Sequence, residues 1–154
     1  TTARIHRLAS ALIRLGVNPA DITHALYESH SLPSRRLLAM ALGTLRVEAG
    51  GRLASMEVTR QMIGTCGGRA EETEGFVDFV RAIDGVQVAV FLREEKRGEV
   101  KVSFRSKGRY DVNRLAGRFG GGGHRAASGC VIQGSLKQAR TQVLKEVRRA
   151  VRRS

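Results

Sequence analysis

The sequence has no Trp and only two cysteines, Cys66 and Cys130, whose spacing fits neither a metal-binding pair nor a disulfide framework. No apolar stretch approaches the roughly 18 residues that a membrane-spanning helix needs, and the first residues lack the apolar core of a signal peptide. The five Phe and two Tyr include no pair placed as a base-stacking platform, which weakens a generic RNA-binding domain. These absences predict a reduced, cytoplasmic protein with no membrane partner.

Complete catalytic constellations are absent as well. The chain contains no Asp-His-His or Asp-x-Asp motif for a two-metal site, and no Ser/His/Asp arrangement can be argued. His6, His24 and His30 have no carboxylate or cysteine at ligand spacing, so we interpret them as surface histidines and not as metal ligands. The sequence predicts no bound cofactor for this chain.

The net charge of +13 is concentrated in the C-terminal part of the chain. Residues 1–92 carry 10 Lys and Arg against 9 Asp and Glu, whereas residues 93–154 carry 17 against 5. This asymmetry indicates a polyanionic partner for the C-terminal part, a nucleic acid or a nucleotide. The alternative is a basic surface that serves solubility alone.

Hydrophobic spacing divides the chain into a helical lead-in and a mixed region. Apolar residues recur at helical spacing in three segments before residue 45, and Asn18-Pro19 is typical of a helix start. Beyond them we expect a hairpin over 45–58, helices over 71–83 and 111–119, strands over 86–92, 100–105 and 126–132, and a final helix from Ser135. The expected fold class is α+β, a mixed β-sheet flanked by helices, with a helical connector at 1–45 and one domain at 46–154.

Four consecutive glycines, Gly120 to Gly123, precede His124 and Arg125. A folded protein keeps such a run where the backbone takes positive φ or approaches another group closely. Glycine amides beside an imidazole and a guanidinium suit a phosphate group. The alternative, a flexible linker, is disfavoured by the ordered-looking segments on both sides. The pattern predicts a ligand loop.

The segment before this loop alternates between apolar and polar residues. Val100, Val102 and Phe104 share one face of the expected strand, and Lys101, Ser103 and Arg105 share the other. Arg105 and Ser106 thus end a strand, a rigid place from which to hold an anion. An exposed edge arginine is the equal alternative.

After the loop, the small residues of 126–129 would let the glycines pack closely on the sheet, and Cys130 is interpreted as a small buried apolar residue. The final helix carries an apolar stripe, and basic residues occupy the rest of its surface. A solvated basic face is the favoured interpretation of this helix, and a face that contacts nucleic acid is the alternative. The stripe comprises Leu136, Ala139, Val143, Leu144, Val147 and Val151.

Taken together, Ser103–Ser106, Asp111–Asn113 and the Gly-Gly-Gly-Gly-His motif resemble the DHH-associated domain of the DHH phosphoesterase family. Within that family the sequence is most similar to the bifunctional oligoribonuclease/phosphoadenosine-phosphate phosphatases, the NrnA type, and more distantly to RecJ-like exonucleases. Glu72–Gly75 and Tyr27–Ser29 support this resemblance, which covers nearly the whole chain.

The resemblance implies a substrate-binding domain. By position, Arg105 and Ser106 would bind a phosphate or the terminal nucleotide, Gly120, Gly121, Gly122 and Gly123 would let the backbone approach the substrate, and His124 would contact the scissile phosphate. Arg125 follows in the same loop. The family's Mn²⁺ ions would lie on a preceding domain that this sequence lacks, so we expect the full protein to be the hydrolase and this chain alone to be inactive.

The expected partners are short RNA or DNA oligonucleotides or phosphorylated nucleotides, and a homodimer is expected only through the full-length protein. Oligoribonucleotides, 3′-phosphoadenosine-5′-phosphate, a cyclic-dinucleotide product and single-stranded DNA stay open as substrates. The alternative function is a non-catalytic RNA- or tRNA-binding module, which resembles the C-terminal domain of alanyl-tRNA synthetases. His124 directly after the glycines and Arg105-Ser106 on the preceding strand favour the phosphoesterase branch.

Overall fold

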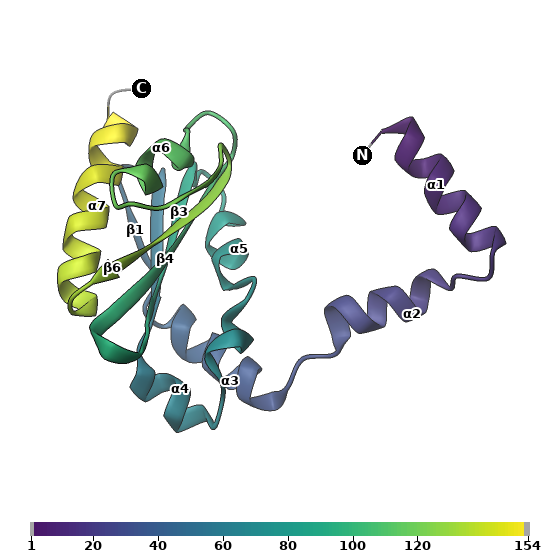
Figure 1. Cartoon of the computed structure of the whole chain (residues 1–154), viewed down its shortest axis with the longest axis horizontal. Helices are drawn as coiled ribbons and strands as arrows, with labels where there is room; N and C mark the ends of the chain where they lie inside the picture. The colour runs from purple at the N-terminus through teal and green to yellow at the C-terminus, as the bar shows by residue number, and fades with distance from the viewer. Residues whose placement is uncertain (1, 153–154) are drawn as a thin grey trace. The chain divides into compact units, whose positions relative to one another are not determined.

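The computed structural model describes residues 2–152, without the side chain of Arg97 (Figure 1). The chain divides into two compact units, Thr1–Leu32 and Pro33–Ser154. No helix among the described residues is long and apolar enough to cross a membrane.

The first unit is helical, as the spacing predicted. It contains α1 (Ala3–Arg14), α2 (Pro19–Thr23) and η1, a π-helical turn (His24–Glu28). The predicted cap at Asn18 is confirmed, because its Oδ1 accepts a hydrogen bond from the Ala20 amide at 3.1 Å. The apolar stripe of α1 is about half exposed, and none of its residues is buried.

The second unit holds a six-stranded sheet in the order β1-β2-β3-β4-β6-β5. The β2–β3 pair is parallel and the other four pairs are antiparallel, so the sheet is mixed, as expected. The strands are β1 (Arg46–Glu48), β2 (Leu53–Val58), β3 (Val88–Glu94), β4 (Glu99–Ser106), β5 (Gly122–His124) and β6 (Ala127–Gln133). The helices are α3 (Leu32–Leu42), α4 (Arg60–Cys66), η2 (Ala70–Thr73), α5 (Phe76–Arg81), η3 (Lys96–Gly98), α6 (Val112–Gly117) and α7 (Leu136–Arg152).

Each face of the sheet has its own core. On one face, α6 and α7 pack against the apolar residues of β3, β4 and β6, and all six predicted stripe residues of α7 are buried there. On the other face, α3 and α5 form a second core with β2 and β3 through Leu37, Phe76 and Val80, and α5 also contacts β4. Figure 1 shows α7 and α5 on opposite sides of the strands. Since α3 belongs to this core, its contacts join it to the second unit. The predicted domain boundary between residues 45 and 46 stays a prediction.

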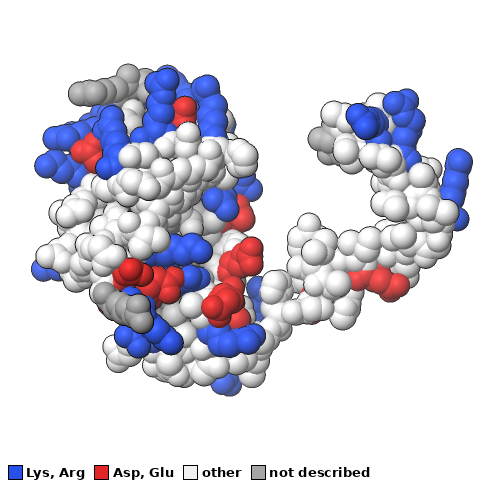
Figure 2. All heavy atoms as spheres, viewed as in Figure 1, with Lys and Arg blue, Asp and Glu red and all other residues white. Residues whose placement is uncertain are grey.

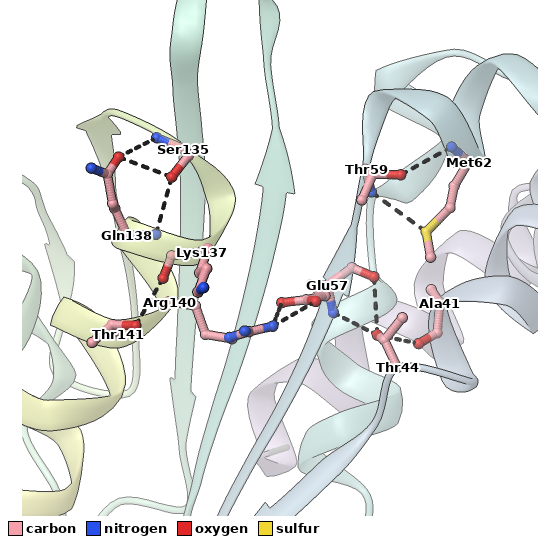
Figure 3. A network of polar contacts seen from close by, with 10 residues as sticks. All are labelled: Ala41, Thr44, Glu57, Thr59, Met62, Ser135, Lys137, Gln138, Arg140 and Thr141. Carbon is pink, nitrogen blue, oxygen red and sulfur yellow. Dashed lines mark hydrogen bonds and ion pairs between the residues drawn. The ribbon is translucent and has the colours of Figure 1, made fainter.

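Arg140 ties α7 to the far end of β2 (Figure 3). Its Nη1 donates to Glu57 Oε1 at 2.9 Å and to Oε2 at 3.0 Å. The Glu57 backbone in turn donates to and accepts from the Thr44 hydroxyl, at 2.9 and 3.0 Å. This network joins the last helix to the strand and to the turn after α3.

One expected helix is wrong in its extent. Residues 71–83 do not form a single helix, because Gly75 takes a left-handed conformation with φ of 80° and separates η2 from α5. Arg93 on β3 holds the resulting turn, donating through Nη1 to Thr73 Oγ1 at 2.6 Å and also to the Ala70 carbonyl. The break places η2 beside the sheet as a separate wall.

Candidate functional site: the open face of the sheet

The β4 strand has one covered face and one open face. Val100, Val102 and Phe104 are fully buried under α6 and α7, which confirms the predicted alternation. Lys101, Ser103 and Arg105 point the other way; α5 contacts β4 on this side, but none of these three residues is buried. We call the side of β4, β6 and β5 that carries Lys101, Ser103 and Arg105 the open face.

Strand register brings Arg105 and His124 onto one row. Arg105 on β4 pairs with Ala127 on β6, and Ala127 pairs with His124 on β5. Directly paired residues of antiparallel strands project to the same face, and two strand spacings separate the outer residues by about 10 Å. The structure therefore aligns two predicted site residues that lie 19 positions apart in the chain.

A groove of about 390 Å³ runs along the open face between β4 and the turn that precedes α5. A second hollow shares Lys101 and Ser103 with it and continues to Gly120 and Gly121. The groove is lined by Glu71, Thr73, Glu74, Gly75, Val77, Phe91, Arg93, Lys101, Ser103 and Arg105. Side chains of both signs line it, with cations on β4 and carboxylates on the opposite wall.

The two cations of β4 form no ion pair with any residue that the structure describes. Arg105 donates through Nη1 only to the backbone carbonyl of Phe104, at 3.1 Å, and is half-buried. Lys101 is exposed and forms no side-chain hydrogen bond within the described part of the chain. Both charges are therefore available to an anion.

The glycine run has two internal structural roles. A Cβ at Gly121 would lie 2.2 Å from the Gly129 carbonyl oxygen and 2.5 Å from Cys130 Cβ, so only glycine fits against β6. Gly123 has φ of 144°, and a Cβ there would lie 2.7 Å from the Ala127 oxygen. The predicted close packing of the glycines on small residues of β6 is confirmed.

Gly120 and Gly122 differ from these two. Gly120 has φ of 72° and follows α6, so the chain turns there in a left-handed conformation. A Cβ at Gly122 would meet only Asn113 Oδ1, at an ordinary 3.8 Å. The sequence suggested a loop, yet Gly122–His124 pair with β6 as the edge strand β5, and an edge leaves a row of backbone groups unpaired.

Ser106 and Arg125 are placed less directly at this face. Ser106 is buried and its hydroxyl donates to the Tyr110 carbonyl at 2.7 Å, on the side of the sheet opposite to Arg105. The Arg125 side chain is exposed, and its carbonyl accepts from the Val112 amide at 2.9 Å. Both residues thus stabilise turns, and the Ser106 hydroxyl does not join Arg105 and His124 on the open face.

The described residues offer no group of three or more His, Cys, Asp or Glu that could hold a metal ion. His124 on β5 is exposed and belongs to no such group among the described residues. Cys130 lies on the covered face, and burial raises its pKa to about 11, which favours the protonated thiol at neutral pH. The described residues thus offer no site for a Mn²⁺ pair, which the resemblance places on a preceding domain.

The groove is also lined by Lys101, Ser103 and Arg93, which were not among the residues that the sequence predicted for the site. The alternation of β4 already placed Lys101 and Ser103 beside Arg105, and that signal could have identified them. Arg93 carried no such signal, because its contacts to Ala70 and Thr73 span more than 19 positions in the chain.

The site thus consists of a strand whose two cations pair with no described carboxylate, beside a glycine-rich edge strand. The sequence profile of the DHHA1 domain matches residues 62–153. The chain therefore belongs to the DHHA1-containing DHH phosphoesterase family.

Two curated relatives are both described as "Bifunctional oligoribonuclease and PAP phosphatase NrnA". The one from Thermus thermophilus is 35% identical, over all of this chain and 46% of its own length. The one from Bacillus subtilis is 30% identical, over 86% of this chain and 41% of its own length. An exopolyphosphatase-related protein from Bacteroides fragilis superposes with a TM-score of 0.89 at 29% identity, over 99% of this chain and 46% of that chain. The chain thus spans about half the length of the proteins it matches.

Proposed function

We propose that the open face binds the phosphorylated end of a short oligonucleotide or of a nucleotide such as 3′-phosphoadenosine-5′-phosphate. The observation that carries this proposal is the shared row of Arg105 and His124, with Arg105 free of ion pairs to described residues. A guanidinium, an imidazole and edge-strand amides are donors that suit a phosphate. The names of the curated relatives support oligonucleotides and PAP as the ligands.

In this proposal the chain recognises substrate and does not perform hydrolysis. The described residues offer no metal cluster, and two-metal phosphodiester hydrolysis needs ions to activate water and to neutralise developing charge. The Mn²⁺ ions would therefore be held outside these residues, and the whole protein would be the phosphodiesterase. Arg105 and His124 would orient the phosphate end, while Ser106 would hold the 106–110 turn that follows β4.

Equilibrium binding of a fluorescent, 5′-phosphorylated dinucleotide tests the proposal. Arg105→Ala removes a charge-assisted contact worth about 1.5–3 kcal/mol, which corresponds to roughly 10- to 100-fold weaker binding. His124→Ala is expected to weaken binding in the same direction. Lys145→Ala on α7, an exposed lysine on the covered side of the sheet, is the matched control and leaves the affinity unchanged.

The same titration separates the RNA-binding module from the proposed function. Figure 2 shows Lys and Arg side chains gathered over α6 and the C-terminal end of α7, away from the groove. If the dinucleotide does not bind while a long RNA binds equally to wild type, Arg105→Ala and His124→Ala, the open face is not the ligand site and the alternative function stands.

A further inference from the structure

The open face continues beyond the row of Arg105 and His124. Along β4, Ser103 and Lys101 follow Arg105 at alternate positions on the same face, and Lys101 lies about 13 Å from Arg105 at strand spacing. This separation is comparable to two internucleotide steps of an extended strand. Neither cation has an ion-pair partner among the described residues, so both charges face the groove unneutralised.

The β6 side of the same face is flat and apolar beside Lys101. Strand register pairs Ser103 with Gly129, which has no side chain, and Lys101 with Val131. Val131 is 53% exposed and lies beyond the residues of β6 that pair with β5, so the sheet ends beside it. An exposed apolar side chain next to a lysine offers one contact for a base or sugar and one for a phosphate.

The opposite wall limits where phosphates can run. Glu71 and Glu74 are exposed carboxylates across the groove from β4. Like charges repel a phosphate there, so a polyanionic chain is held along β4 and away from η2. The wall is kept in place by Arg93, which donates to Thr73 and Ala70.

We propose that Lys101, with Val131 beside it, forms a second subsite that makes the groove select oligonucleotides of three or more nucleotides over shorter ones. This inference rests on the proposed function, because it assumes that Arg105 and His124 hold the phosphorylated end. Ser103 lies midway between the two cations, and its hydroxyl forms a hydrogen bond, as donor or acceptor, with the intervening nucleotide.

The test compares 5′-phosphorylated oligonucleotides of two, three and four nucleotides on wild type and on Lys101→Ala. For wild type, affinity rises with length. Lys101→Ala leaves dinucleotide affinity within twofold and loses a roughly three- to fivefold gain at low salt, the size expected for an exposed ion pair. Its slope of log K against log salt for the tetranucleotide falls in magnitude by up to about 0.7, the value for one contact to a single strand.

Lys145→Ala is the matched control, since it removes the same charge from an exposed site on α7; it preserves the length gain. Val131→Ser, also at an exposed position, reduces the gain without changing dinucleotide affinity. The subsite is overturned if wild type shows no length gain, if Lys101→Ala keeps the gain, or if it weakens all lengths equally. Failure of the proposed function looks different: the dinucleotide does not bind, or Arg105→Ala does not weaken it.

Discussion

The basic residues on the two sides of β4 and β6 differ in whether they pair with carboxylates. On the covered side, arginines of α7 are bound to carboxylates: Arg140 to Glu57, Arg148 to Glu48 at 2.6 Å, and Arg149 to Glu146 at 2.7 Å. The hydrogen bond that Arg148 donates to Glu48 raises the pKa of Arg148, and the hydrogen bonds and charges of Arg118 and Arg149 lower the pKa of Glu146.

On the open side, by contrast, Arg105 and Lys101 meet no carboxylate among the described residues within ion-pair distance. The comparison teaches that local net charge does not distinguish cations that are paired with carboxylates from cations that are not. The α7 side holds more basic residues than the β4 side, but the charges that remain available to a phosphate in the groove lie on β4. The predictions below disturb each side in turn.

The largest expected effect is on the glycine packing that builds the open side. Gly121→Ala places a Cβ 2.2 Å from the Gly129 oxygen, so backbone must shift, and we expect a loss of about 3 kcal/mol of unfolding free energy. Gly122→Ala, whose Cβ would meet only an atom 3.8 Å away, is the matched control and changes stability by less than about 0.5 kcal/mol. Urea denaturation measures both, and equal losses would contradict the assigned packing roles.

A second prediction compares the removal of Arg140 with the removal of Arg105. Arg140→Ala leaves the largely buried Glu57 carboxylate unpaired, and we expect a loss of about 2 kcal/mol of unfolding free energy, between the values for surface and buried pairs. Arg105→Ala removes no ion pair to a described residue and costs less than about 0.5 kcal/mol. For dinucleotide affinity the order is reversed: Arg105→Ala weakens binding more than Arg140→Ala does. If Arg105→Ala destabilised the fold as much as Arg140→Ala, the two sides would not differ as described.

The smallest expected effect concerns the exclusion of water from the core on the covered side of the sheet. Burial raises the Cys130 pKa from 9.0 to about 11, so the folded chain holds this proton more tightly than the unfolded chain. The resulting stability is fully present below pH 9 and is lost as the pH rises through 11. The difference in melting temperature between wild type and Cys130→Ala should therefore be constant below pH 9 and shift against wild type above it. A constant difference up to pH 11 would show that the thiol is not desolvated.

Local patterns predicted much of this molecule. The helical stripe of α7, the alternation of β4 and the Asn18 cap depend on residues within a few positions of one another, and each is observed. Extended to the end of β4, this alternation puts Ser106 on the face opposite to Arg105, which the assignment of both residues to an anion overlooked. The structure places the Ser106 hydroxyl as the alternation indicates.

Long-range pairing was beyond the sequence patterns. The row of Arg105 and His124 requires β6 to lie between β4 and β5, an order that periodicity does not contain. The partners of Arg140 and Arg148 lie 83 and 100 positions away, so these two ion pairs could not be identified from local spacing. The break at Gly75 was missed because the helical spacing of the apolar residues in 76–83 follows directly on the charged segment before it. Both segments were therefore interpreted as one helix.

The central claim is that the phosphorylated end binds on the open side. Backbone amide chemical shifts, followed by NMR while a 5′-phosphorylated dinucleotide is titrated into the chain, test it most directly. The account predicts that the largest shift changes fall on Ser103, Arg105 and Gly120–His124, with the amides of α7 unchanged. Changes concentrated on α6 and α7, with β4 and β5 unaffected, would contradict it.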